Sequence, residues 1–123
     1  LIDACDLVIT TSNATAHMSG AIGKKTFLLV PYLIGKMWYW HEGDTQSIWY
    51  PSISIFRQNK LGDWEDPINK IVELLIEYGA DVADGNEKGR TPCHVAANFG
   101  SFKLLSILLD AGATPKKHRS ICR

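Results

Sequence analysis

A repeated pattern in the C-terminal half places the strongest constraint on the fold. Residues 74–80, Leu-Leu-Ile-Glu-Tyr-Gly-Ala, recur as residues 107–113, Ile-Leu-Leu-Asp-Ala-Gly-Ala, and the glycines Gly79 and Gly112 lie 33 residues apart. Self-similarity at such a period is typical of proteins built from stacked helical repeats. One repeat cannot bury its apolar face alone, so each repeat must pack against a neighbour. The pattern therefore predicts a layered helical segment.

The residues between the two copies resemble the ankyrin family. Residues 89–97 are Gly-Arg-Thr-Pro-Cys-His-Val-Ala-Ala, and Gly100 and a leucine-rich stretch, residues 104–109, follow. The resemblance covers residues 71–115, and 33 residues is the ankyrin period. It implies an α-solenoid element that binds a protein partner.

The resemblance also implies a role for each position. Thr91 and Pro92 cap and start the first helix, and Gly100 turns the chain toward the second. The small side chains of Ala96 and Ala97 let the paired helix approach closely. The layer between repeats is filled by leucines: Leu104, Leu105, Leu108 and Leu109. Cys93 is a small apolar replacement for the usual leucine. We expect His94 to bond the turn rather than bind metal.

One helix is expected to serve both halves of the chain. Residues 64–79 begin after the N-cap candidate Asp63, carry acids in the first turn and end at Gly79. The apolar face of this helix fits the second helix of an ankyrin repeat as well as the last helix of an α/β domain. We therefore expect one and a half repeats over 68–115. Three arrangements are open: the repeats pack against the α/β part, they form one end of a longer array, or they form a marginally stable appendage.

The N-terminal part predicts a β-α-β unit. Leu7–Thr11 is an apolar run without alternation, typical of a strand buried on both faces of a parallel sheet, and Thr26–Val30 is a second such strand. Ser12 and Asn13 are good N-caps for a helix over Ala14–Ile22. We expect Gly20 and Gly23 to let this helix pack closely on the sheet. The fold class is α/β, a partial Rossmann-like unit followed by the helical repeat.

A long aromatic stretch follows the second strand. Residues 31–52 contain six Trp and Tyr side chains, and residues 53–58 form a third candidate strand. Loops of this length inside compact domains are uncommon and are often functional.

Residues 1–78 resemble the C-terminal half of GT-B glycosyltransferases of the heptosyltransferase-like kind, including those linked to tetratricopeptide repeats. The motifs that carry the resemblance are Asp6–Thr10, Ser12–His17, Gly20–Lys24, Trp49–Ser52, Phe56–Gln58 and Gly62–Trp64. The resemblance implies that this strand-turn-helix holds the diphosphate of a nucleotide sugar. It defines a nucleotide-sugar domain over 1–79.

The predicted phosphate-binding residues are Ser12, Asn13, Ala14, Thr15 and His17. A helix N-terminus after a buried strand offers unpaired backbone N–H groups and the positive end of a dipole, both of which suit a diphosphate. The alternative is structural: Ser12 and Asn13 only cap the helix, and His17 packs beside them. Many relatives carry an aspartate where Ser12 or Asn13 stands.

The aromatic loop offers two interpretations. Trp38, Trp40 and His41 can contact a sugar or acceptor, or they can anchor the loop, since buried aromatic side chains stabilise long loops by their area. No catalytic residue is assigned, because the resemblance places the catalytic base in an N-terminal half that this sequence does not contain. We therefore expect a fragment with no activity alone and no cofactor beyond the nucleotide-sugar donor. The alternative is a non-enzymatic interaction protein whose α/β part caps the ankyrin surface.

Composition and charge exclude several classes of partner and ligand. The net charge is zero and the pI is about 7.1, which gives no electrostatic attraction for nucleic acid. Phe27–Ile34, the most apolar stretch, is too short to cross a bilayer. Cys5, Cys93 and Cys122 lack the spacing of a zinc site or a disulfide framework, so a cytoplasmic protein without metal is expected. Residues 116–123 form a basic tail.

Overall fold

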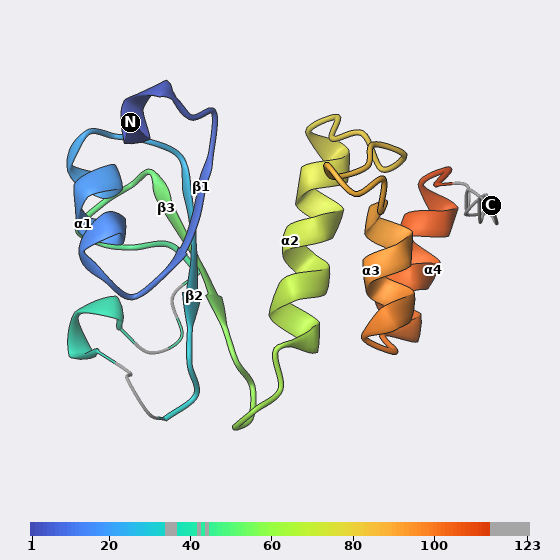
Figure 1. Cartoon of the computed structure of the whole chain (residues 1–123). Helices are drawn as coiled ribbons and strands as arrows, with labels where there is room; N and C mark the ends of the chain where they lie inside the picture. The colour runs from blue at the N-terminus through green and yellow to red at the C-terminus, as the bar shows by residue number, and fades with distance from the viewer. Residues whose placement is uncertain (34–36, 42, 44, 114–123) are drawn as a thin grey trace, which may run out of the picture. The chain divides into compact units, whose positions relative to one another are not determined.

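The computed structural model describes residues 1–33, 37–41, 43 and 45–113, and the predicted tail lies outside them (Figure 1). The chain divides into two compact units, Leu1–Ile71 and Val72–Arg123. The elements in chain order are the 3₁₀ helix η1 (Ile2–Ala4), β1 (Val8–Thr11), α1 (Ala14–Ala21), β2 (Thr26–Val30), the 3₁₀ helix η2 (Trp38–Trp40), β3 (Ile53–Arg57), α2 (Glu65–Glu77), α3 (Pro92–Asn98) and α4 (Phe102–Asp110). No helix of the described part is long and apolar enough to cross a membrane.

The described strands of the first unit form a parallel sheet in the order β1-β2-β3. Thr26 of β2 pairs with Val8 on one side and with Ile53 on the other. The central strand β2 is almost wholly buried, as its apolar run predicts. The predicted burial of the first strand on both faces is wrong, because β1 is an edge strand of the described sheet and Ile9 is 45% exposed.

Helix α1 packs against one face of this sheet. The buried cluster there contains Ala16 of α1, Leu28 and Val30 of β2, Ile53 and Ile55 of β3, and Trp40. Gly20 lies so close to the sheet that a Cβ atom would stand 2.5 Å from Cγ of Tyr50 and 2.9 Å from Cδ1 of Ile53. The close packing predicted for Gly20 is therefore confirmed. A Cβ atom at Gly23 would meet no atom within 4 Å, and the φ of Gly23 is +70°, so this glycine ends the helix instead of packing on the sheet.

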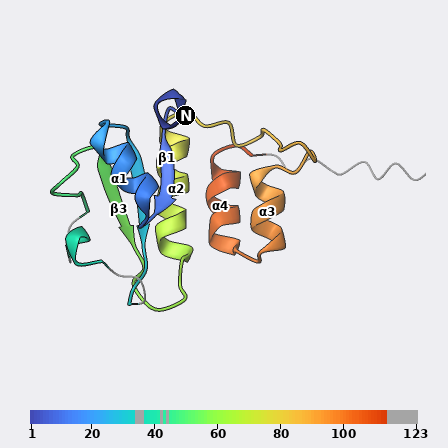
Figure 2. The same ribbon diagram turned by 60° about the vertical axis from the view of Figure 1, so that its left-hand side comes forward.

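The second unit is built from the end of α2 and the pair α3 and α4. Figures 1 and 2 both show α3 and α4 side by side and antiparallel. The buried core contains Cys93, Ala96, Leu108 and Ala113, with Val72, Ile76, Val82, Leu104 and Leu105 packed around it. The expected packing roles of Ala97 and Leu109 are wrong, because Ala97 is exposed and Leu109 is 43% exposed, and neither belongs to the buried core.

A capping box starts α3. The backbone N–H of Thr91 donates to Nδ1 of His94 over 3.2 Å, and Oγ1 of Thr91 lies 2.8 Å from the same nitrogen. Pro92 follows in the first turn, where its missing N–H costs nothing. The predicted turn-bonding role of His94 is confirmed.

Replacing Gly20 with alanine should destabilise the first unit by about 1–3 kcal/mol, because the added methyl group overpacks the contact with Tyr50 and Ile53. Urea unfolding measures the change. The control is Met18→Ala on the exposed side of the same helix, which should have little effect. Equal stability of Gly20→Ala and the native chain would contradict the close packing.

Replacing Asn69 with leucine should stabilise the chain. Asn69 is 3% exposed, and neither polar atom of its amide has a hydrogen-bond partner among the described residues. A buried unpaired polar group costs about 1–3 kcal/mol, which a leucine of similar shape avoids. Thermal unfolding should show a higher Tm for Asn69→Leu and no gain for Asn98→Leu at an exposed helical position. A lower Tm for Asn69→Leu would show that the amide is satisfied.

Candidate functional site

Ser12 and Asn13 form the turn between β1 and α1, as predicted. Oδ1 of Asn13 accepts a hydrogen bond from the backbone N–H of Ala16 over 3.3 Å, which caps α1. Oγ of Ser12 accepts from Nε1 of Trp40 over 2.8 Å. Both side chains therefore bond to groups of the protein itself. Ala14 and Thr15 form the first turn of α1, the former exposed and the latter half-buried.

His17 lies in an aromatic cluster formed with Tyr39, Trp40 and Tyr50. Its ring stacks on that of Trp40, with centroids 5.2 Å apart and an interplanar angle of 21°. Tyr39 and Tyr50 meet the imidazole ring edge to face, and Nδ1 of His17 lies 3.3 Å from the hydroxyl oxygen of Tyr50. These contacts match the structural alternative for His17. Diphosphate binding by the turn stays a prediction.

The three predicted sugar or acceptor contacts, Trp38, Trp40 and His41, lie in different environments. Trp40 is 1% exposed and belongs to the core, whereas Trp38 is 77% exposed. A guanidinium nitrogen of Arg57 donates to the backbone carbonyl oxygens of Trp40 and His41. His41 has a φ of +33°, and its Nε2 is buried without a hydrogen-bond partner among the described residues. For Trp40 the geometry fits the loop-anchoring interpretation.

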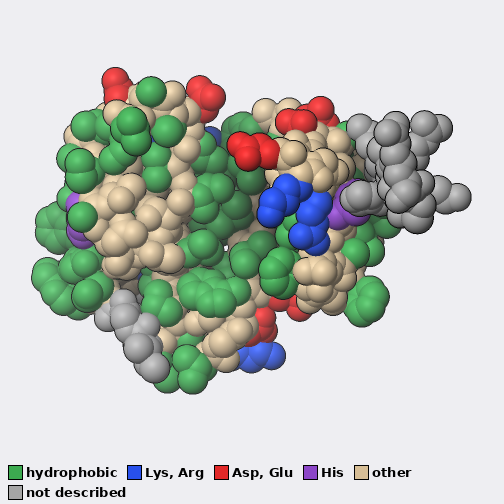
Figure 3. All heavy atoms as spheres, in the orientation of Figure 1, with side chains coloured by type: hydrophobic (Ala, Val, Ile, Leu, Met, Phe, Trp, Pro, Cys, Tyr) green, Lys and Arg blue, Asp and Glu red, His purple; other side chains and the backbone are tan. Residues whose placement is uncertain are grey.

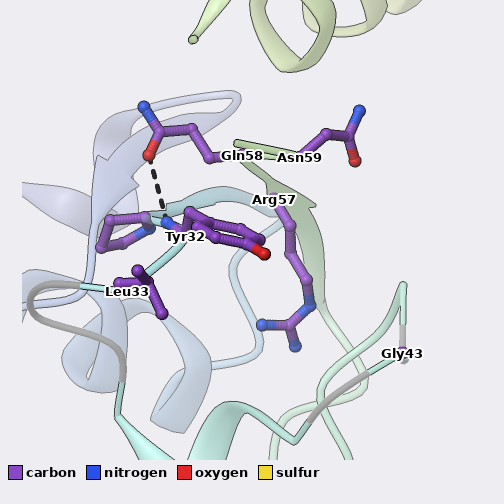
Figure 4. A pocket seen from close by; sticks show the side chains of 7 residues that line it. Tyr32, Leu33, Gly43, Arg57, Gln58 and Asn59 are labelled. Atoms are coloured by element: carbon purple, nitrogen blue, oxygen red, sulfur yellow. Dashed lines mark hydrogen bonds between the residues drawn. The ribbon is translucent and has the colours of Figure 1, made fainter. Parts of the chain in front are cut away.

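A cavity of about 430 Å³ lies beside the carboxyl ends of β2 and β3 (Figure 4). Its lining is Pro31, Tyr32 and Leu33 after β2, Arg57, Gln58 and Asn59 at the end of β3, and Gly43. The buried Gln58 joins the two strand ends, because its Oε1 accepts from the backbone N–H of Tyr32 over 3.1 Å. Open parallel sheets bind ligands at this edge. The sequence analysis did not predict this cavity. The residues that directly follow two neighbouring parallel strands could have indicated it, because such residues meet at one edge of the sheet.

Metal ligands do not gather in the described part of the chain. No group of three His, Cys, Asp or Glu side chains there can hold a metal ion. Cys5 is an exposed free thiol and Cys93 is a buried one.

The second unit exposes large apolar side chains where α3 and α4 meet. Phe99 is 80% exposed and Phe102 is 82% exposed, on either side of the turn at residues 100–101. Apolar side chains reach the surface at this end of the helix pair (Figure 3). These two phenylalanines are candidates for contact with another macromolecule.

The second unit also contains an apolar cavity of about 280 Å³. It is lined by Val72, Leu75 and Ile76 of α2, Ala80, Asp81 and Val82 of the following loop, Pro92 and Val95 of α3, and Leu104 and Leu108 of α4. Asp81 is the single charged residue in this lining. The cavity therefore suits aliphatic side chains rather than a polar ligand.

Comparison with known proteins identifies the helical segment. The sequence model of the family "Ankyrin repeats (3 copies)" matches residues 67–119. Protein FlbA of Caulobacter vibrioides is 34% identical over 80 residues, 65% of this chain and 13% of FlbA. The inactive serine/threonine-protein kinase TEX14 of Bos taurus is 43% identical over 51 residues, 42% of this chain and 3% of TEX14. The ADP-ribosylation factor GTPase-activating protein AGD4 of Arabidopsis thaliana is 42% identical over 45 residues, 37% of this chain and 6% of AGD4. No solved structure matches the chain.

These similarities identify the ankyrin segment but do not identify the family of the α/β unit. The chain spans 13% or less of each of these relatives. The sequence from residue 67 onward is shorter than 80 residues, so the similarity to FlbA includes part of the α/β unit. None of the similarities supports the predicted resemblance of residues 1–78 to GT-B glycosyltransferases. The family match, the 33-residue period and the capping box agree that residues 67–119 of this chain are ankyrin repeats.

Proposed function

We propose that the chain is a protein-interaction module in which the ankyrin segment binds a protein partner. The observation that carries the proposal is the pair Phe99 and Phe102, which are both at least 80% exposed at one end of the α3–α4 pair. Burying a phenylalanine side chain in an interface contributes about 1.5–3 kcal/mol. Burial of both side chains would therefore contribute favourably to the binding of a partner at this end.

The α/β unit acts in this proposal as a structural cap. The polar side chains expected to hold phosphate are bonded within the unit: Asn13 caps α1, Ser12 binds Trp40, and His17 contacts Tyr50. The contacts of Ser12 and His17 tie Trp40 and Tyr50, which lie between β2 and β3, to the start of α1. The interaction function of the chain thus needs no bound nucleotide.

Site-specific photo-cross-linking in the native host tests the proposal. A photoreactive amino acid replaces Phe99 or Phe102 in the full chain, and illuminated cells are analysed for cross-linked products. We expect one discrete protein partner at both positions. The control places the same amino acid at Met18, an exposed apolar position of the α/β unit, where the product should not form. Cross-linking to the same protein from Met18 alone would reject the ankyrin segment as the binding surface.

Binding of a nucleoside diphosphate is the second candidate function. It is supported by the 430 Å³ cavity at the carboxyl edge of the sheet and by the strand-turn-helix in which Asn13 caps α1. A fragment of a glycosyltransferase-like protein would use such a site for its nucleotide-sugar donor. This candidate makes the α/β unit a ligand-binding domain instead of a cap.

A thermal-shift titration with a panel of nucleoside diphosphates tests the second candidate. A ligand present at 100 times its Kd stabilises the folded protein by about 2.7 kcal/mol, which raises the Tm measurably. His17→Ala and Asn13→Ala should abolish the shift even where they lower the starting Tm. An unchanged Tm with every nucleotide, in a chain that melts cooperatively, would reject this candidate.

A further inference from the structure

The 33-residue period shows which ankyrin element the earlier repeat lacks. Shifted back by one period, α3 (Pro92–Asn98) falls on residues 59–65. The structure has turns and irregular chain over residues 59–64, and α2 begins only at Glu65. The second helix of the earlier repeat is thus present without a first helix at the expected position.

The residues at that position could not replace the missing helix. Cys93 and Ala96, the buried residues of α3, correspond to Lys60 and Asp63. These two form a surface ion pair, with Nζ of Lys60 3.3 Å from a carboxylate oxygen of Asp63 and the lysine side chain 75% exposed. Two charged residues on the packing face would be costly to bury, so this sequence does not supply the first helix.

The apolar cavity lies where a first helix would pack. In the complete repeat, Leu105 and Leu108 of α4 pack in the cluster with Cys93 and Ala96 of α3. Their counterparts one period earlier are Val72 and Leu75 of α2, and both line the 280 Å³ cavity. The face of α2 that matches the α3-binding face of α4 therefore lines the cavity, although Val72 also packs against the buried cluster.

We propose that this cavity binds one amphipathic helix of a partner protein, which takes the place of the missing first helix. The proposal rests on the proposed interaction function and names its partner chemistry. The helix carries small apolar side chains at i and i+3, the spacing of Cys93 and Ala96. The cavity holds these side chains while the helix backbone lies along α2 and α3.

The charge at the cavity indicates which side chains should flank the apolar face of the partner helix. Asp81 is the one charged residue in the lining of the cavity. A helix with lysine or arginine beside its apolar face is therefore attracted, whereas an acidic helix is repelled. The expected partner is a basic amphipathic helix.

A stapled helical peptide tests the site on the full chain. The peptide repeats residues 90–101 with Cys93→Ala and a lysine added at each end, and fluorescence anisotropy measures its Kd. We expect saturable binding that weakens at least tenfold in Val95→Lys, since Val95 lines the cavity and is already 39% exposed. Leu109→Lys, at a similarly exposed position outside the lining, is the matched control and should leave the Kd unchanged.

Two further arms sharpen the test. Asp81→Lys should weaken binding, and a peptide with Ala96→Glu should not bind. Circular dichroism checks that each protein variant keeps its helices. Absence of peptide binding, or equal Kd values for Val95→Lys and Leu109→Lys, would overturn the helix-docking proposal. Cross-linking at Phe99 and Phe102 is read separately, so its persistence in that case would leave the interaction module standing and reject the cavity alone.

Discussion

The burial of apolar side chains along α2 is the constraint on which both units depend. The helix buries Pro67 and Ile71 in its first half, while Val72 and Ile76 pack against the ankyrin core in its second half. The division between the two compact units falls within this helix, between Ile71 and Val72. It also explains why the ankyrin match begins within a helix and not at a loop. Substitutions in α2 therefore affect the stability of two structures.

The sequence predicted the elements whose pattern depends on local chemistry. The bounds of β2, the helix start at Ala14 and the Thr91–His94 cap follow from apolar runs and capping residues. The misses depend on neighbours that no local pattern specifies. Ile9 of the edge strand β1 is 45% exposed, and Leu109 of α4 is 43% exposed. Strand order and helix rotation are tertiary properties, so periodicity alone did not reveal them.

The candidate sites also divide into features that local sequence predicts and features that depend on tertiary structure. Sequence reasoning placed Ser12 and His17 among the predicted phosphate-binding residues and gave Trp40 a separate role in the aromatic loop. The structure joins the three residues through a hydrogen bond and a stacked ring pair. It did not find the cavity at the sheet edge, which arises from loop ends that are far apart in sequence. The apolar cavity of the ankyrin segment was also missed, although the half repeat that produces it was predicted. A missing helix leaves a sequence signature, whereas the space beside it appears only in three dimensions.

The burial of Trp40 has a consequence for how the chain can be observed. All four tryptophans lie before residue 65, and Trp40 is buried while Trp38 and Trp49 are largely exposed. All of the indole emission therefore comes from the first unit, with the blue-shifted part from the buried Trp40, and α3 and α4 contribute none. Far-ultraviolet circular dichroism is dominated instead by helices, including α3 and α4. The two signals together distinguish a chain that melts in one step from one whose halves melt apart.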